Sequence, residues 1–395
     1  MKTTDTTSKR ARRGAVLASG LACAALLLGG CAAEPREAAD AAIVIQNTQN
    51  VPTWDDTVLD EAIAQVRSSG GRVTVTIADS NPTSQTFDFG EVADSALNQD
   101  RLERKLRDAL RQGADDPGVD LLKSIEVGAT SIAGSSNVVG VYVVSSGIAD
   151  TGLLNMAGSN LVEADADAVA EYYAAKNELP DLSWVRVVTW YGMGATADGQ
   201  TAPSTAQKAS MEALYQAVLE KCGTGLSVQN ASVARPEPRG GGLPAVGVVE
   251  FAPTEPYVAA SGTDANAATE FSSTQLGFVG DGVEFVDPAQ AAAALGGIAE
   301  QLKANPGLAA TVTCGAASYP WEEGYSQELS ERRAAAVCAA LQDMGVDASQ
   351  LTPRGVGNGG NADDIDPETG LQDPQKAAAK RTTVIEVHAN GNATA

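Results

Sequence analysis

The stretch QELSERRAAAVCAALQDMG, residues 327–345, is where the fold of the C-terminal region can first be worked out. Its last residue, Gly345, is the residue type that most commonly closes a helix. The stretch therefore predicts a helix over Gln327–Met344. Apolar runs flank it, Ala310–Cys314 before and Leu351–Gly355 after, and each of them predicts a strand.

The same pattern extends outward in both directions. Residues 282–286 predict a further strand, and the Asp-Pro pair at 287–288 supplies an N-cap and a first-turn proline for an alanine-rich helix over 289–304. A last strand is predicted over Thr382–His388. Residues 277–390 therefore predict an α+β domain with the element order β-α-β-α-β-β.

Three motifs in this domain carry a resemblance to a known family. Residues 329–334 read LSERRA, residues 354–357 read RGVG, and residues 380–387 read KRTTVIEV. The OmpA-like peptidoglycan-binding domain has, at these places, its LSxxRA signature, a strand-and-loop motif and a closing NRRVEI strand. The region therefore resembles that family, and the resemblance implies non-covalent binding to the stem peptide of peptidoglycan.

The resemblance also implies a role for Arg333. In the family, an aspartate and the LSxxRA arginine hold the ammonium and the carboxylate of a diaminopimelate side chain. A guanidinium suits this task because it meets a carboxylate bidentately. We expect Arg333 near the start of its helix, where the positive helix end also favours an anion. The alternative is a surface arginine paired with Glu328 or Glu331.

The sequence departs from the family pattern in the loop before this helix. Ser318 stands where the family has its aspartate, and Ser326 replaces the asparagine that precedes LSxxRA. Glu322 and Glu323 lie in the same loop; they either supply the missing negative charge or are solvated loop acids. The resemblance thus implies a site with its carboxylate-binding half intact and its ammonium-binding half weakened.

The cysteines allow one disulfide bridge. After a signal segment is removed, Cys222, Cys314 and Cys338 remain besides a lipidated Cys31. Three thiols in an oxidising compartment permit one bridge and one leftover thiol. The family fold packs the strand that ends at Cys314 beside the helix that carries Cys338, so these two are the predicted pair. Two buried free thiols are the alternative.

The first residues predict export and lipidation. Residues 1–30 combine four early basic residues with a short apolar stretch, as a signal peptide does. They end in Leu-Gly-Gly before Cys31, which resembles a bacterial lipobox and implies acylation of that cysteine by chains such as palmitate. Residues 31–40 are a predicted tether. The protein is then anchored to the extracytoplasmic face of the cell membrane; an ordinary secretory signal or an uncleaved anchor is the alternative.

Residues 41–251 alternate apolar runs with helical patterns, which predicts an α/β domain with a mainly parallel, Rossmann-like sheet. The predicted strands are Ala42–Ile45, Arg72–Ile77, Val138–Val144, Trp184–Tyr191 and Ala245–Phe251. The predicted helices are Thr57–Arg67, Gln99–Arg111, Asp165–Lys176 and Thr205–Lys221. Residues 252–276 have the composition of a linker.

The loop after the first of these strands resembles part of a von Willebrand factor A domain. That family has a DxSxS motif there, which binds Mg²⁺ because a carboxylate and two hydroxyls converge as oxygen ligands. Here Gln46, Thr48 and Asn50 occupy the three positions, and Ser145-Ser146 stands where the family has a later aspartate. The resemblance implies a degenerate A-type domain without a metal; a generic Rossmann-like domain is the alternative.

Charge and composition narrow the function. Lys plus Arg total 27 against 50 Asp plus Glu, a net charge of -23, which disfavours nucleic acid as a partner. The only histidine, His388, allows neither a multi-histidine metal site nor a well-embedded Ser-His-Asp triad. We find no nucleotide-binding or nucleophile-elbow motif. The sequence therefore predicts a protein that is not an enzyme and uses no cofactor or metal.

Together these features predict a lipid-anchored envelope protein. Its OmpA-like domain would bind peptidoglycan, and its A-like domain would bind a protein partner or act as a spacer. One alternative is an envelope scaffold whose two domains have both lost their ancestral ligands. An envelope hydrolase that uses carboxylates of the first domain is a third.

Overall fold

The computed structural model describes residues 37–197, 199–231, 233–235, 242–244, 246–251, 267–319 and 322–389. The predicted signal segment, Cys31 and most of the predicted linker lie outside these residues. Among the described helices, none has both the length and the hydropathy that crossing a bilayer requires. Two larger sheets organise the described chain, one before residue 230 and one after residue 266.

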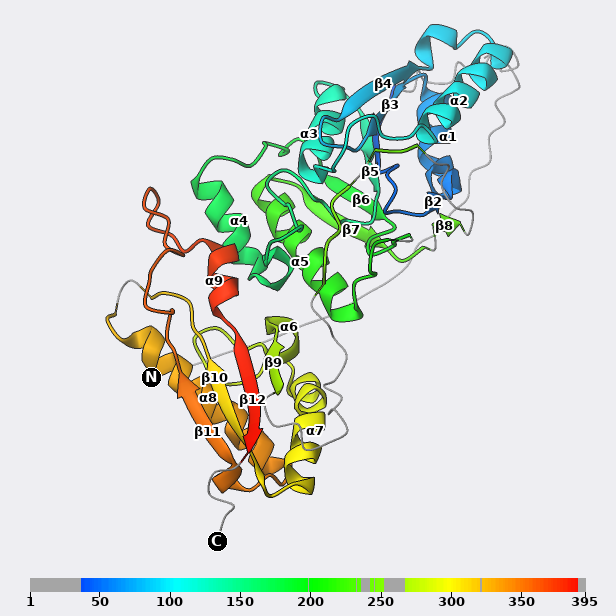
Figure 1. Cartoon of the computed structure of the whole chain (residues 1–395). Coiled ribbons are helices and arrows are strands. Elements are labelled where there is room, and N and C mark those ends of the chain that lie inside the picture. Colours follow the sequence, from blue (N-terminus) through cyan, green and yellow to red (C-terminus); the bar gives the residue numbers. More distant parts are fainter. Residues whose placement is uncertain are drawn as a thin grey trace, which may run out of the picture. The chain divides into compact units, whose positions relative to one another are not determined.

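The first sheet has six strands in the order β4-β3-β1-β5-β6-β7 (Figure 1). All neighbouring strands are parallel except β3 and β4, which are antiparallel. Every residue of the central strand β1 is buried, as expected for a strand covered on both faces. The prediction of a mainly parallel α/β sheet is confirmed. The strands are β1 (Asp40–Ile45), β3 (Arg72–Ile77), β4 (Thr83–Asp88), β5 (Val138–Val144), β6 (Val187–Tyr191) and β7 (Gly225–Gln229).

Helices cover both faces of this sheet. Side chains alternate between the faces of a strand, so Ala42 and Val44 of β1 join the core formed with α3, α4 and α5, whereas Ile43 and Ile45 join the core formed with α1 and α2. These helices are α1 (Asp60–Ser69), α2 (Ala96–Leu110), α3 (Leu121–Ser131), α4 (Ala166–Ala175) and α5 (Thr205–Lys221). The shorter elements are β2 (Thr53–Trp54), β8 (Ala234–Arg235) and the 3-10 turns Asp56–Leu59, Gly90–Val92 and Leu161–Glu163.

The predicted strand at 245–251 is wrong. Its residue Val249 is buried, but the backbone N–H and C=O of Val249 bond to the side-chain amide of Gln200, at 3.0 and 2.7 Å, and not to a neighbouring strand. The edge position of the sheet belongs to β7, which the sequence analysis did not predict, and β4 and α3 were also missed. The composition of this segment resembles that of a strand, but a buried amide side chain, and not a neighbouring strand, provides the hydrogen bonds that its backbone needs.

The second sheet has four strands in the order β11-β10-β12-β9. β10 and β11 are parallel, and the other pairs are antiparallel. Helices α7 and α8 share one apolar core with this sheet (Figure 1). The strands are β9 (Ala267–Phe271), β10 (Leu308–Cys314), β11 (Leu351–Gly355) and β12 (Thr383–Ala389). The helices are α6 (Ser273–Leu276), α7 (Pro288–Ala304), α8 (Tyr325–Asp343), α9 (Pro374–Lys380) and the 3-10 turn Ala348–Gln350.

The predicted order β-α-β-α-β-β is correct for its four strands and two main helices, with the first strand moved. The short helices α6, before α7, and α9, between β11 and β12, were not predicted. Residues 282–286 do not form the predicted strand; Phe278 and Phe285 make an isolated bridge, and their rings stack with centroids 5.1 Å apart. We call residues 277–286 the capping loop. The first strand of this sheet is instead β9, which lies within the stretch predicted to be a linker. It forms a strand because it pairs with β12.

The predicted disulfide between Cys314 and Cys338 is wrong. Both thiols are free and buried in the core of the second sheet, as is Cys222 in that of the first. The sulfur of Cys314 lies 3.4 Å from the hydroxyl of Thr383 on β12. Burial raises the pKa of Cys338 to about 11. The apolar core, and not a bridge, joins the strand to the helix.

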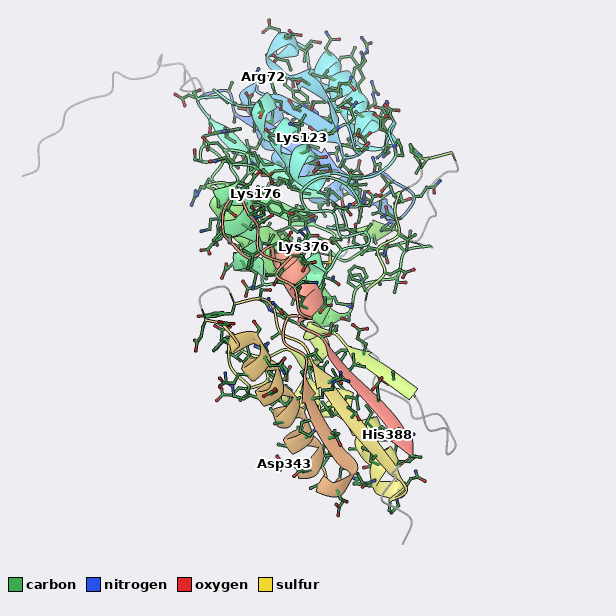
Figure 2. The ribbon with its side chains drawn as sticks, turned by 60° about the vertical axis from the view of Figure 1, so that its left-hand side comes forward. Arg72, Lys123, Lys176, Asp343, Lys376 and His388 are labelled. Atoms are coloured by element: carbon green, nitrogen blue, oxygen red, sulfur yellow. The ribbon has the colours of Figure 1, made fainter. Side chains whose placement is uncertain are left out.

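His388, the only histidine of the chain, lies on β12 (Figure 2). Its Nε2 is 3.0 Å from the hydroxyl of Thr311 on β10. The contact joins two paired strands, so a structural role explains the position of this residue.

Candidate functional site

Arg333 lies well inside α8. The helix begins at Tyr325, after Gly324 with a φ of 83°, so Arg333 is in its third turn. The expectation that Arg333 stands at the helix start is therefore wrong. The charge of the helix terminus acts mainly on the first turn, so it contributes little at this position.

The side chain of Arg333 is held by backbone carbonyls of the capping loop. It is 4% exposed; Nε donates to the carbonyl of Gly282 at 3.1 Å, and Nη2 donates to that of Gly280 at 2.6 Å. Its guanidinium carbon lies 5.0 Å from the ring centroid of Phe278. The capping loop thus fixes the orientation of the guanidinium and desolvates it.

The alternative interpretation, a surface arginine paired within its own helix, is also wrong. Glu328 pairs with the neighbouring Arg332 at 3.7 Å, and Glu331 accepts a hydrogen bond from Gln327 at 2.7 Å. Across the described residues, Arg333 forms no ion pair, and Nη1 has no hydrogen bond. The Nη1 side of the buried Arg333 guanidinium is therefore available to a further hydrogen-bond acceptor.

A second guanidinium lies close to the first. Arg381 follows α9, and its Nη2 donates to the Oε1 of Gln372 at 2.6 Å. Burial lowers the pKa of Arg333, and the positive charge of Arg381 lowers it further, while Asp281 opposes the shift. Burial also lowers the pKa of Arg381. Within the described part of the chain neither arginine has a carboxylate at ion-pair distance. A bound anion would therefore offset both the burial of the two guanidiniums and the repulsion between them.

Both arginines line a cavity of about 300 Å³. Its walls are largely apolar or aromatic, and the rings of Tyr319 and Tyr325 pack with centroids 4.4 Å apart. We call this cavity the two-arginine pocket. It is lined by Arg333, Arg381, Ser318, Tyr319, Tyr325 and Leu329, by Gly280 and Asp281 of the capping loop, by Ala317, Leu371 and Gln372, and by Ala168, Glu171 and Tyr172 of α4.

Ser318, at the family's aspartate position, contacts a carboxylate from elsewhere in the chain. It is buried; its N–H donates to the Oδ2 of Asp364 at 2.7 Å, and its hydroxyl donates to Oδ1. Asp364 is fully buried and also pairs with Lys380, whose Nζ lies 2.7 Å from Oδ1. Burial would raise the pKa of Asp364, but the hydrogen bonds from Lys380 and Ser318 outweigh it and lower that pKa.

The remaining predicted site residues stay outside the pocket. The hydroxyl of Ser326 donates to the carbonyl of Ala317 at 2.9 Å and so joins the loop to the start of α8. Glu322 and Glu323 are exposed and do not line the pocket. The structure therefore brings Arg333 and Ser318 to one cavity. The carboxylate that contacts Ser318 is that of Asp364, outside the pocket lining, and not that of either glutamate.

The loop after β1 forms the second candidate site. Gln46, Thr48, Asn50, Ser145 and Ser146 are all buried, and they converge at the carboxyl ends of β1 and β5. The Oε1 of Gln46 accepts from both serine hydroxyls, at 2.7 and 3.0 Å, and its Nε2 donates to Thr48 at 3.1 Å and Asn50 at 3.3 Å. We call these five residues the glutamine network. A crevice at such a point, where the strand order reverses, is a common ligand site in α/β sheets.

The glutamine network satisfies itself. The hydroxyl of Thr48 donates to Asn50 at 2.6 Å, and the indole N–H of Trp54 donates to the backbone carbonyl of Gln46 at 2.5 Å. The described residues contain no cluster of three or more His, Cys, Asp or Glu side chains arranged to hold a metal. An amide N–H, which is a donor, points at the oxygens that a cation would need. The network therefore offers no charged ligand for Mg²⁺.

The comparisons with known proteins concern the C-terminal region. Residues 280–375 match the model of the OmpA family. Those residues are an OmpA family domain. The predicted resemblance is thereby confirmed over this range, which includes Arg333, Ser318 and Asp364. A search of curated proteins finds no match to the chain.

Solved structures that match part of the chain include the following three. The periplasmic domain of Helicobacter pylori MotB is 18% identical, over 33% of this chain and 82% of that one, with a TM-score of 0.25. The peptidoglycan-associated lipoprotein from Burkholderia pseudomallei is 22% identical, over 28% and 86%, with a TM-score of 0.22. The OmpA-like domain of FopA1 from Francisella tularensis is 19% identical, over 35% and 93%, with a TM-score of 0.23.

Proposed function

We propose that this protein is a non-enzymatic, lipid-anchored envelope protein that binds peptidoglycan through the two-arginine pocket of its OmpA family domain. OmpA-like domains bind peptidoglycan, and residues 280–375 form such a domain. The observation that carries the proposal is the desolvated guanidinium of Arg333, which has no carboxylate partner among the described residues and lines a cavity.

The chemistry of the pocket suits the carboxylate end of a stem peptide. A buried guanidinium gains most from an anion because little water competes for it. The carbonyls of Gly280 and Gly282 hold Arg333 in a fixed orientation before a ligand arrives, which reduces the entropy lost on binding. The aromatic pair Tyr319 and Tyr325 supplies an apolar wall for the aliphatic arm.

The anchor and the first domain complete the proposal. We propose that an acylated Cys31 holds the protein to the extracytoplasmic face of the cell membrane, because the sequence before it resembles a lipobox. Incorporation of labelled palmitate that a Cys31→Ser variant loses tests this anchor. The first domain is proposed to be a degenerate A-type domain, since the sequence after β1 resembles that family's DxSxS loop, and to bind a protein partner or act as a spacer.

Sedimentation with purified peptidoglycan sacculi tests the central step. We expect Arg333→Ala in the full-length protein to weaken retention about tenfold or more, because a charged hydrogen-bond pair is lost from a buried site. Arg332→Ala is the matched control, since it removes the same charge from an exposed neighbour paired with Glu328. Arg333→Lys keeps the charge without the fork and is expected to bind with intermediate strength.

The second candidate function is an envelope scaffold without a cell-wall ligand. It is favoured by the way in which Asp364 and Lys380 already satisfy each other beside Ser318. Failure of the folded wild-type protein to sediment with sacculi at low salt would support the scaffold. Equal retention of the Arg333→Ala and Arg332→Ala proteins, with thermal unfolding showing both to be folded, would instead remove Arg333 from the mechanism.

A further inference from the structure

The carboxylate that contacts Ser318, a residue of the pocket lining, is already paired with a lysine of this chain. Lys380 Nζ lies 2.7 Å from Asp364 Oδ1, 2.6 Å from Asp363 Oδ1 and 2.7 Å from the side-chain oxygen of Asn361. An ammonium has three N–H donors, so these contacts use all of them. Asp364 in turn is fully buried and does not line the pocket.

The groups that do line the pocket are unequal in charge. Its wall carries the buried guanidinium of Arg333 and the half-buried side chain of Arg381. Its two lining acids, Asp281 and Glu171, are exposed, and Glu171 lies 3.6 Å from Lys221. Solvent-exposed acids bind an ammonium weakly because water screens the attraction. The interior of the pocket therefore favours negative charge and offers no buried carboxylate to a cationic group.

We propose that Lys380 is a built-in substitute for the ammonium group of a ligand, and that the pocket selects a carboxylate on an aliphatic arm with no free ammonium beside it. This inference rests on the proposed function, and it names the ligand class of the same site. Ser318 takes part because its N–H and hydroxyl hold the Asp364 carboxylate facing Lys380 and not the pocket. A peptide carboxylate, whose neighbouring nitrogen is acylated, belongs to the selected class.

Two small molecules test, on the wild-type protein, whether the pocket prefers a carboxylate ligand without an ammonium group or one with it. Pimelate and meso-diaminopimelate share the same seven-carbon chain and two carboxylates, and only the second carries ammonium groups. Calorimetric titration of the full-length protein is expected to show that pimelate binds at least as tightly as meso-diaminopimelate. A preference of about tenfold or more for meso-diaminopimelate, equal to one fully formed charge contact, would overturn the inference.

Variants of α9 sharpen the test. Lys380→Ala frees the carboxylate of Asp364, and we expect the preference to move by about tenfold toward meso-diaminopimelate. Lys376→Ala is the matched control, because Lys376 lies on the same helix (Figure 2) but is exposed and pairs with Asp373 at 3.5 Å; it should leave both affinities unchanged. If Lys380→Ala unfolds, the wild-type comparison still decides.

Failure of this inference and failure of the proposed function give different results. Retention on sacculi with no binding of pimelate would overturn the carboxylate selectivity and leave peptidoglycan binding in place. Loss of retention on sacculi together with a preference for pimelate would support the selectivity and overturn peptidoglycan binding. Arg381→Met should weaken pimelate about tenfold; unchanged affinity would overturn the role of the second guanidinium.

Discussion

Neither the loop after β1 nor the loop after β10 has an aspartate at the position where the family predicted for it from the sequence carries one. After β1, the neutral side chain of Gln46 occupies the position of the aspartate. It forms hydrogen bonds with the hydroxyls of Ser145, Ser146 and Thr48. After β10, Ser318 occupies the position of the aspartate. Its backbone N–H donates to the carboxylate of Asp364, which is also paired with Lys380. The first loop has no charge left, whereas the second keeps the unpaired Arg333 next to a cavity.

The difference shows two ways in which a loop without such an aspartate can be completed. A network of neutral groups can close completely, because every donor finds an acceptor within the protein. A buried guanidinium without a carboxylate retains an unmet interaction, and this favours a ligand. The glutamine network is therefore a structural element, and the two-arginine pocket is the candidate for binding.

The largest expected effect comes from returning a charge to the glutamine network. Gln46→Glu replaces the two N–H donors with acceptors and buries a carboxylate against the oxygens of Thr48 and Asn50. We expect the free energy of unfolding in urea to fall by at least about 3 kcal/mol. Recovery of that stability on adding Mg²⁺ would contradict the account, because the network would then be a metal site that lacks one charge.

A smaller effect is expected from removing the charge beside Ser318. Asp364→Asn should lower the free energy of unfolding by about 2 kcal/mol, because Lys380 loses its buried carboxylate partner and keeps only the exposed Asp363 and the oxygens of Asn361. Asp363→Asn is the matched control: its carboxylate is exposed, so we expect a change below about 1 kcal/mol.

The difference in the free energy of unfolding between wild type and Asp364→Asn should depend on pH in a definite direction. The folded protein lowers the pKa of Asp364, so the stability from its charge is fully present above the ordinary pKa of an aspartate, about 3.9, and is lost as the pH falls through the lowered value. Unfolding curves should therefore show wild type and Asp364→Asn converging at acid pH. A gap that widens at acid pH would mean that folding raises the pKa of this carboxyl instead of lowering it.

The parts of the fold that follow from local pattern were predicted well. The bounds of β3 and β5 agree with the prediction, and α8 differs by two residues at its start. Each is a run whose apolar pattern or end signal lies within its own residues. β9 was missed because Ala267–Phe271 has no distinctive pattern and becomes a strand only by pairing with β12.

The site was predicted only in part, for a similar reason. Arg333 and Ser318 were found because a motif marks them, and Gln46 and the two serines after β5 were named only through the predicted resemblance to a family motif. Asp364 and Lys380 stand 16 residues apart in polar segments, and nothing local signals that they pair. The capping loop, which buries Arg333, depends on the packing of Phe278 and is likewise invisible in the linear pattern.

A single ¹H–¹⁵N spectrum of the full-length protein, recorded while a soluble muropeptide is added, tests the contrast most directly. Two buried side-chain N–H groups report on the two regions: Arg333 Nε, which donates to Gly282, and Trp54 Nε1, which donates to Gln46. Both are hydrogen-bonded and shielded from solvent, so their signals should be retained. The account predicts that the Arg333 signal shifts with muropeptide and the Trp54 signal stays in place. A shift of Trp54 with Arg333 unmoved would contradict it.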